Sequence, residues 1–154
     1  MSEPAKKLKI CLDTSVPNCL FVTDYRLVHT MRFWEKCQAG KYDIVLSPIF
    51  FEELDRCPQP KLSWLRAKID LILFETPEET DEVKNLAAEY FKVGVTEDNF
   101  NDCLHIAYAV IAGCDKLVSW NFTHLAKEDT IEGVKVINAI KLYKAIGIVP
   151  PASL

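Results

Sequence analysis

Four polar side chains follow or border the apolar segments of this 154-residue chain, and three of them are carboxylates. Carboxylates that cluster raise one another's pKa unless a cation offsets their charge. Oxygen ligands from Asp, Glu and Asn suit a hard ion, Mg²⁺ or Mn²⁺, which clamps phosphate oxygens and activates water. The chemistry that such a set would perform is phosphodiester hydrolysis. The four residues are Asp13, Glu53, Asp102 and Asn121.

Short apolar runs alternate with amphipathic segments, which predicts a mostly parallel sheet with helices on both faces. A length of 154 residues suits a single α/β domain that covers residues 1–154. About five strands are predicted, at 8–12, 44–46, 71–74, 117–119 and 134–137. Helices are predicted over 25–39, from Pro48 to about Arg56, over 62–69, from a capping box at Thr76–Glu79 to Gly94, over 101–112, and from an Asn138 cap to Gly147.

The carboxyl ends of parallel strands form the rim where such sheets bind ligands. Asp13 directly follows a predicted strand and Asn121 lies two residues after another, and the helix that carries Glu53 begins on the same rim. Asp102 lies in the first turn of a helix entered from a loop whose edge the sequence does not fix. Taken singly, these acids have ordinary roles: an Asx-turn, a solvated charge, or a complement to the helix dipole. Their shared rim favours one acidic site.

Two adjacent glutamates compete for the site on the predicted helix that begins at Pro48. Glu53 lies three residues after Phe50 and four before Cys57, so that it borders the apolar stripe of the helix. Glu52 is predicted to lie on the solvent-facing side of the helix. A carboxylate on a core-facing border is costly to leave unpaired, so we predict that Glu53 is the functional residue.

A set of neighbouring side chains is predicted to support the carboxylates by hydrogen bonding, with capping and turn formation as the alternative. This set comprises Thr14, Ser15, Asn101 and Thr123. His105 lies three residues after Asp102 on the same predicted helix, and no second His is placed to join it as a metal ligand. We therefore predict a hydrogen-bonded core histidine.

The sequence resembles the PIN-domain nucleases over nearly its whole length. The matching segments are 10–15, the pair Glu53–Leu54 after 46–48, 102–107 and 117–122. The resemblance implies a three-layer α/β/α sandwich, Mg²⁺- or Mn²⁺-dependent cleavage of RNA, a homodimer and, in bacteria and archaea, a common role as the toxin of a toxin–antitoxin pair. It places Asp13, Glu53 and Asp102 at the three acidic metal-site positions. Asn121 stands where many members have a fourth acid, which removes one negative charge.

Composition sets further limits on function. The chain has 18 Lys and Arg against 22 Asp and Glu, a formal net charge of −4, so bulk charge does not favour nucleic-acid binding. A nuclease can nevertheless bind a polyanion through bound cations and local basic groups. Six scattered cysteines form no C-x-x-C pair; we expect thiols and a reducing, cytoplasmic location. Neither a signal-peptide core nor a membrane-spanning run is found.

Two alternatives remain open beside the ribonuclease. A haloacid-dehalogenase-like phosphatase also has an Asp at a strand end, but it expects a second Asp two residues later, where this chain has Ser15. A PIN-fold module that binds RNA or protein with a weakened site would explain Asn121. No P-loop or dinucleotide-binding glycine motif occurs.

Overall fold

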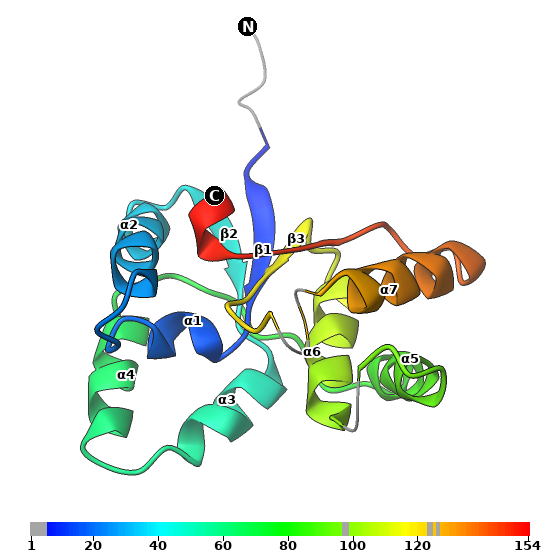
Figure 1. Cartoon of the computed structure of the whole chain (residues 1–154), viewed down its shortest axis with the longest axis horizontal. Helices are drawn as coiled ribbons and strands as arrows, with labels where there is room; N and C mark the ends of the chain where they lie inside the picture. The colour runs from blue at the N-terminus through cyan, green and yellow to red at the C-terminus, as the bar shows by residue number, and fades with distance from the viewer. Residues whose placement is uncertain (1–5, 97–98, 123–124, 126) are drawn as a thin grey trace, which may run out of the picture.

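Four parallel strands form the central sheet, in the order β2-β1-β3-β4 (Figure 1). The computed structural model describes residues 6–96, 99–122, 125 and 127–154. The strands are β1 (Leu8–Leu12), β2 (Tyr42–Val45), β3 (Lys116–Val118) and β4 (Gly147–Val149). The helices are α1 (Ser15–Asn18), α2 (Arg26–Gln38), α3 (Pro48–Asp55), α4 (Lys61–Ile69), α5 (Asp81–Lys92), α6 (Phe100–Ile111) and α7 (Glu128–Ile140), followed by a 3₁₀ turn at Pro151–Ser153.

Helices cover the sheet on both sides, as the sequence predicts. In Figure 1, α2 and α4 lie on one side and α5, α6 and α7 on the other. Successive residues of β1 point to opposite faces of the sheet: Ile10 and Leu12 belong to the core beneath α2 and α4, whereas Cys11 belongs to the core beneath α5 and α6. The three-layer α/β/α fold is therefore confirmed.

The predicted count of about five strands is wrong, because the residues that the structure describes form four. Residues 71–74 form a turn and coil, and the neighbouring Glu75 makes a single parallel bridge with Val45. Residues 134–137 lie within α7, where Val134 is buried and packs into the core beside α5. Tertiary packing at helical spacing thus overrides the β-branched composition of this run.

The last strand and two predicted caps also differ from expectation. Asn138 lies inside α7 and accepts a hydrogen bond from the Tyr90 hydroxyl, so it does not cap a later helix. The segment from Gly147 is instead strand β4, paired with β3. The capping residue of α5 is Thr80, whose hydroxyl accepts from the Val83 N–H at 3.3 Å, and not Thr76.

Two helix ends near the site follow their sequence signals closely. Ser47 caps α3 by accepting a hydrogen bond from the Phe50 N–H at 3.3 Å, and Pro48 occupies the first helical position. Helix α6 ends before Gly113, which adopts a φ of 75° that other residues rarely adopt. These two helices carry the predicted carboxylates Glu53 and Asp102.

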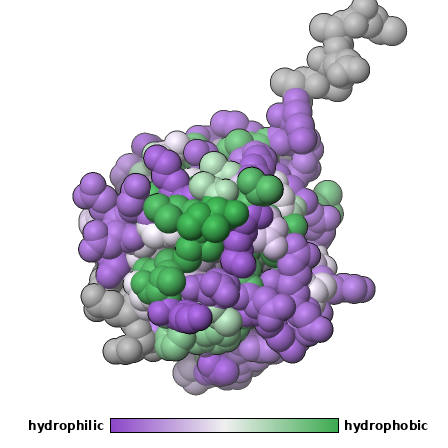
Figure 2. All heavy atoms as spheres, turned by 90° about the vertical axis from the view of Figure 1, so that its right-hand side faces the viewer, coloured by the Kyte–Doolittle hydropathy of each residue, from purple (hydrophilic) through white to green (hydrophobic). Residues whose placement is uncertain are grey.

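Large apolar side chains remain exposed along and after α7. Val136, Ile140 and Leu142 are 50%, 75% and 91% exposed. Figure 2 looks onto this side of the molecule, where apolar side chains gather between charged ones. No helix within the described ranges is long and apolar enough to cross a membrane.

Candidate active site

Asp13 is a buried carboxylate at the carboxyl end of β1. Its side chain is 4% exposed and accepts hydrogen bonds from the Ser15 N–H at 3.1 Å, the Ser15 hydroxyl, and the Ser119 hydroxyl at 2.6 Å. Burial raises the pKa of Asp13, and the Glu53 charge raises it further; His105 and the two serine hydroxyls oppose the rise. The carboxylate is therefore held in a fixed orientation by its neighbours.

The two serines extend this hydrogen bonding into the segment after β3. The Ser15 hydroxyl accepts from the Trp120 N–H, and the Ser119 hydroxyl accepts from the Asn121 N–H, both at 2.9 Å. Parallel pairing of β1 with β3 aligns Leu12 with Val118, so that the residues following each strand meet. Ser119 was not among the predicted site residues. The sequence analysis places Ser119 inside a predicted strand, whereas β3 ends at Val118, and the nearby Asn121, two residues later, was the available signal.

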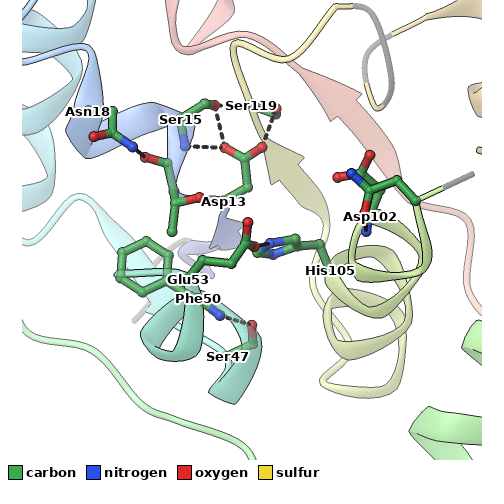
Figure 3. Close-up of polar contacts among 11 residues, drawn as sticks. Asp13, Ser15, Asn18, Ser47, Phe50, Glu53, Asp102, His105 and Ser119 are labelled. Atoms are coloured by element: carbon green, nitrogen blue, oxygen red, sulfur yellow. Dashed lines mark hydrogen bonds and ion pairs between the residues drawn. The ribbon is translucent and has the colours of Figure 1, made fainter. Parts of the chain in front are cut away.

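Glu53 reaches from α3 to His105 on α6 (Figure 3). His105 Nε2 donates to Glu53 Oε1, and the two side chains are 2% and 30% exposed. Burial by itself would lower the pKa of His105, but the hydrogen bond to Glu53 and the charges of Glu53, Asp13 and Asp102 outweigh it and raise the pKa. His105 is thus the hydrogen-bonded core histidine expected, and negative charge from three separate elements acts on it.

Asp102 lies in the first turn of α6 and is 6% exposed. The side chain of Asn99 caps this helix by accepting from the Asp102 N–H at 3.4 Å. In Figure 3, Asp102 lies at the start of α6, apart from the contact between Glu53 and His105. Within the described part of the chain, no three His, Cys, Asp or Glu side chains are grouped so that they could hold a metal ion.

The remaining predicted residues have different positions. Ser15 contacts Asp13, whereas Thr14 contributes its backbone carbonyl, which accepts from Asn18 Nδ2 at 2.8 Å. Asn101 and Asn121 are half-buried. Thr123 lies outside the described residues. A separate hollow of about 570 Å³ lies beside β2 and is lined by residues such as Tyr42, Leu73 and Glu75. None of the predicted site residues lines it.

Comparison with solved structures identifies the architecture. VapC20 of Mycobacterium tuberculosis, a toxin that cleaves the sarcin–ricin loop, superposes with a TM-score of 0.56 at 21% identity over 73% of this chain and 89% of that one. VapBC2 of Rickettsia felis, solved with a DNA fragment of its promoter, gives 0.54 at 16% identity over 93% and 98%. FitAcB of Neisseria gonorrhoeae gives 0.54 at 16% identity over 94% and 99%.

The chain has the PIN-domain fold. No family model and no curated protein matches its sequence. The PIN fold places the carboxyl ends of β1 and β3, the start of α3 and the start of α6 around one region of the molecule. The predicted acids lie on these elements.

Proposed function

We propose that this protein is a metal-dependent endoribonuclease that hydrolyses phosphodiester bonds in single-stranded or structured RNA. The observation that carries the proposal is the convergence of negative charge on His105. Asp13 directly follows β1, Glu53 lies on α3 and Asp102 lies in the first turn of α6; Glu53 contacts His105, and the charges of all three act on this one imidazole. Such convergence of acids from different elements is typical of catalytic sites.

The residues present fit a divalent cation in chemical type. Asp13, Glu53 and Asp102 would hold Mg²⁺ or Mn²⁺ through carboxylate oxygens, and Asn121 would add its carbonyl oxygen. The raised pKa of buried Asp13 indicates a place where an added positive charge would be stabilising. When bound, the metal would supply charge neutralisation at the scissile phosphate and an activated water.

The protein's own groups would orient the carboxylates. Hydroxyl groups of Ser15 and Ser119 fix both oxygens of Asp13, and His105 fixes one oxygen of Glu53. Because Glu53 binds His105 in this arrangement, the imidazole and a metal would compete for the same carboxylate. His105 is accordingly assigned as the residue that holds Glu53 in the metal-free arrangement.

A cleavage assay tests the proposed function. Purified protein is incubated with end-labelled single-stranded RNA and Mn²⁺, alongside Asp102→Asn and Glu53→Gln. Glu52→Gln is a matched control, because Glu52 is exposed one residue away on the same helix. We expect metal-dependent cleavage that both site variants abolish and the control retains. Equal loss in Glu52→Gln, or cleavage unaffected by Asp102→Asn, would refute the assignment.

A physiological role as the toxin of a toxin–antitoxin pair is part of the same proposal. It is supported by the similarity to a VapC toxin, to VapBC2 and to FitAcB. An antitoxin protein would then be a partner, and a homodimer is expected, with the exposed apolar residues of α7 as candidate contacts. Co-expression with the product of a neighbouring small gene should relieve growth arrest. Light scattering should give twice the 17.5 kDa chain mass.

A binding module without catalysis is the second candidate. The contact between Glu53 and His105 favours it, as does the amide at position 121, because both reduce the negative charge available to a metal. Calorimetry with Mn²⁺ separates the two candidates. RNA binding without metal binding or cleavage would favour the module.

A further inference from the structure

Three aromatic rings gather at the segment that leaves β3 for the rim of the sheet. Trp120 is 6% exposed, whereas Tyr25 and Phe122 on either side of it are 67% and 45% exposed. The ring centroids of Tyr25 and Phe122 lie 6.1 and 5.9 Å from that of Trp120. We call Tyr25, Trp120 and Phe122 the aromatic platform.

The centre of the aromatic platform is fixed by polar contacts. Trp120 Nε1 donates to the Thr30 hydroxyl at 2.8 Å, and its backbone N–H donates to the Ser15 hydroxyl at 2.9 Å. The ring of His29 lies 6.4 Å from the indole, tilted by 48°. The two outer rings therefore rest against a rigid base.

Neither outer ring is stacked on the indole of Trp120. The ring planes of Tyr25 and Phe122 make angles of 86° and 80° with that of Trp120, so neither ring lies flat on the indole. Both side chains keep a large exposed fraction. Exposed aromatic side chains of this kind are what an unpaired base stacks on.

The aromatic platform adjoins the predicted acidic site. Trp120 binds Ser15, whose hydroxyl contacts Asp13. Phe122 is three residues after Ser119, whose hydroxyl lies 2.6 Å from Asp13, and three residues span at most about 11 Å. A base on the platform would belong to a nucleotide close to a phosphate at Asp13.

Charge at the aromatic platform argues for stacking as the source of affinity. Arg26, which follows Tyr25, pairs with Asp24 through two hydrogen bonds of 2.9 and 2.7 Å, and the chain carries a net charge of −4. Phosphate attraction is therefore weak here. Bases of a duplex are already stacked, whereas those of a single strand are available.

We propose that Tyr25 and Phe122 bind unpaired bases of single-stranded RNA beside the acidic site, with Trp120 as their support. The proposal rests on the proposed function in taking RNA as the substrate. It adds the residues that would contact the unpaired bases and so favour a single strand or loop over a duplex.

Binding measured without metal tests this proposal separately from cleavage. A fluorescein-labelled single-stranded oligouridylate is titrated with protein in EDTA at low salt, and anisotropy gives Kd. We expect Tyr25→Ala and Phe122→Ala each to weaken binding by about 5- to 150-fold. Tyr25→Phe, which keeps the ring face, should bind like the wild type. Leu73→Ala is the control, because Leu73 is 92% exposed and lies outside the platform.

The outcomes distinguish the two proposals. Wild-type affinity in both alanine variants, or no binding of the oligonucleotide by the wild type, overturns the platform whatever the cleavage assay shows. If both alanine variants lose binding and the wild type shows no cleavage, the platform is supported and the nuclease is refuted. A hairpin duplex should bind weakly and equally to all variants; equal losses on duplex and single strand would contradict selection of unpaired bases. Circular dichroism verifies folding of the variants.

Discussion

Removal of the Ser119 hydroxyl provides a sharp test of how Asp13 is held. Ser119 is completely buried, donates to Asp13 Oδ2 at 2.6 Å and accepts from the Asn121 N–H at 2.9 Å. A hydrogen bond to a charged group contributes about 1.5–3 kcal/mol. Ser119→Ala should therefore lower the free energy of unfolding by about 2–3 kcal/mol, and Tm by roughly 4–12 °C for a chain of this size.

The assay is urea denaturation at pH 7, with Ser153→Ala as the matched control. The Ser153 hydroxyl also donates one hydrogen bond, to the Pro150 carbonyl at 2.9 Å, but that contact is exposed. Its loss should change stability by no more than about 0.5 kcal/mol. Repeating Ser119→Ala in an Asp13→Asn background completes a double-mutant cycle, and a coupling of about 1 kcal/mol or more is expected.

Two results would refute this account of Asp13. In the first, Ser119→Ala lowers the free energy of unfolding no more than Ser153→Ala does. In the second, Ser119→Ala lowers it equally with Asp and with Asn at position 13. In either case the hydroxyl would only fill space, and the orientation of the carboxylate would have another cause.

Other predictions concern His105 and the thiols. His105→Gln should bind Mn²⁺ more tightly than the wild type in calorimetry, because it removes the imidazole that would compete with the metal for Glu53; unchanged or weaker binding would contradict that role. Burial raises the pKa of Cys37 from 9.0 to about 12, so the folded state keeps a proton that the unfolded state loses above pH 9. The contribution of Cys37 to the free energy of unfolding is therefore complete below pH 9 and falls by about 1.4 kcal/mol per pH unit between pH 9 and pH 12. Cys37→Ala should reduce the measured dependence of the free energy of unfolding on pH by that amount. All six cysteines are free and Cys57 is the half-exposed one, so a thiol reagent should label Cys57 first in the native protein, as mass spectrometry would show.

The sequence was informative where local signals and tertiary packing agree. Apolar runs predicted the strands that precede Asp13 and Asn121, and helical spacing predicted that Glu53 is less exposed than Glu52. It failed at residues 134–137, where burial of Val134 against α5 decides for a helix. Strand β4 has only three residues and is defined by its pairing with β3, which no local pattern encodes.

The same distinction between local sequence signals and tertiary packing applies to the site. The position of Glu53 on its helix followed from periodicity, but its contact with His105, 52 residues away, depends on how α3 and α6 pack. Ser119 has no distinctive local signal, since a serine after a strand is also a common turn residue. Its importance follows from strand order, which places β3 beside β1.

The register of β1 against β3 ties the chemistry of the site to global unfolding. The Asp13 N–H donates to the Val118 carbonyl at 3.2 Å, directly after Leu12 pairs with Val118. A shift of one residue would turn Ile10 and Leu12 into the opposite core and displace Asp13 from Ser119. The Asp13 amide should consequently exchange its hydrogen only when the whole sheet opens, unlike the lids and loops from which many active sites are built. Such a site loses its geometry only together with the fold, which leaves little room for gradual loosening by heat or denaturant.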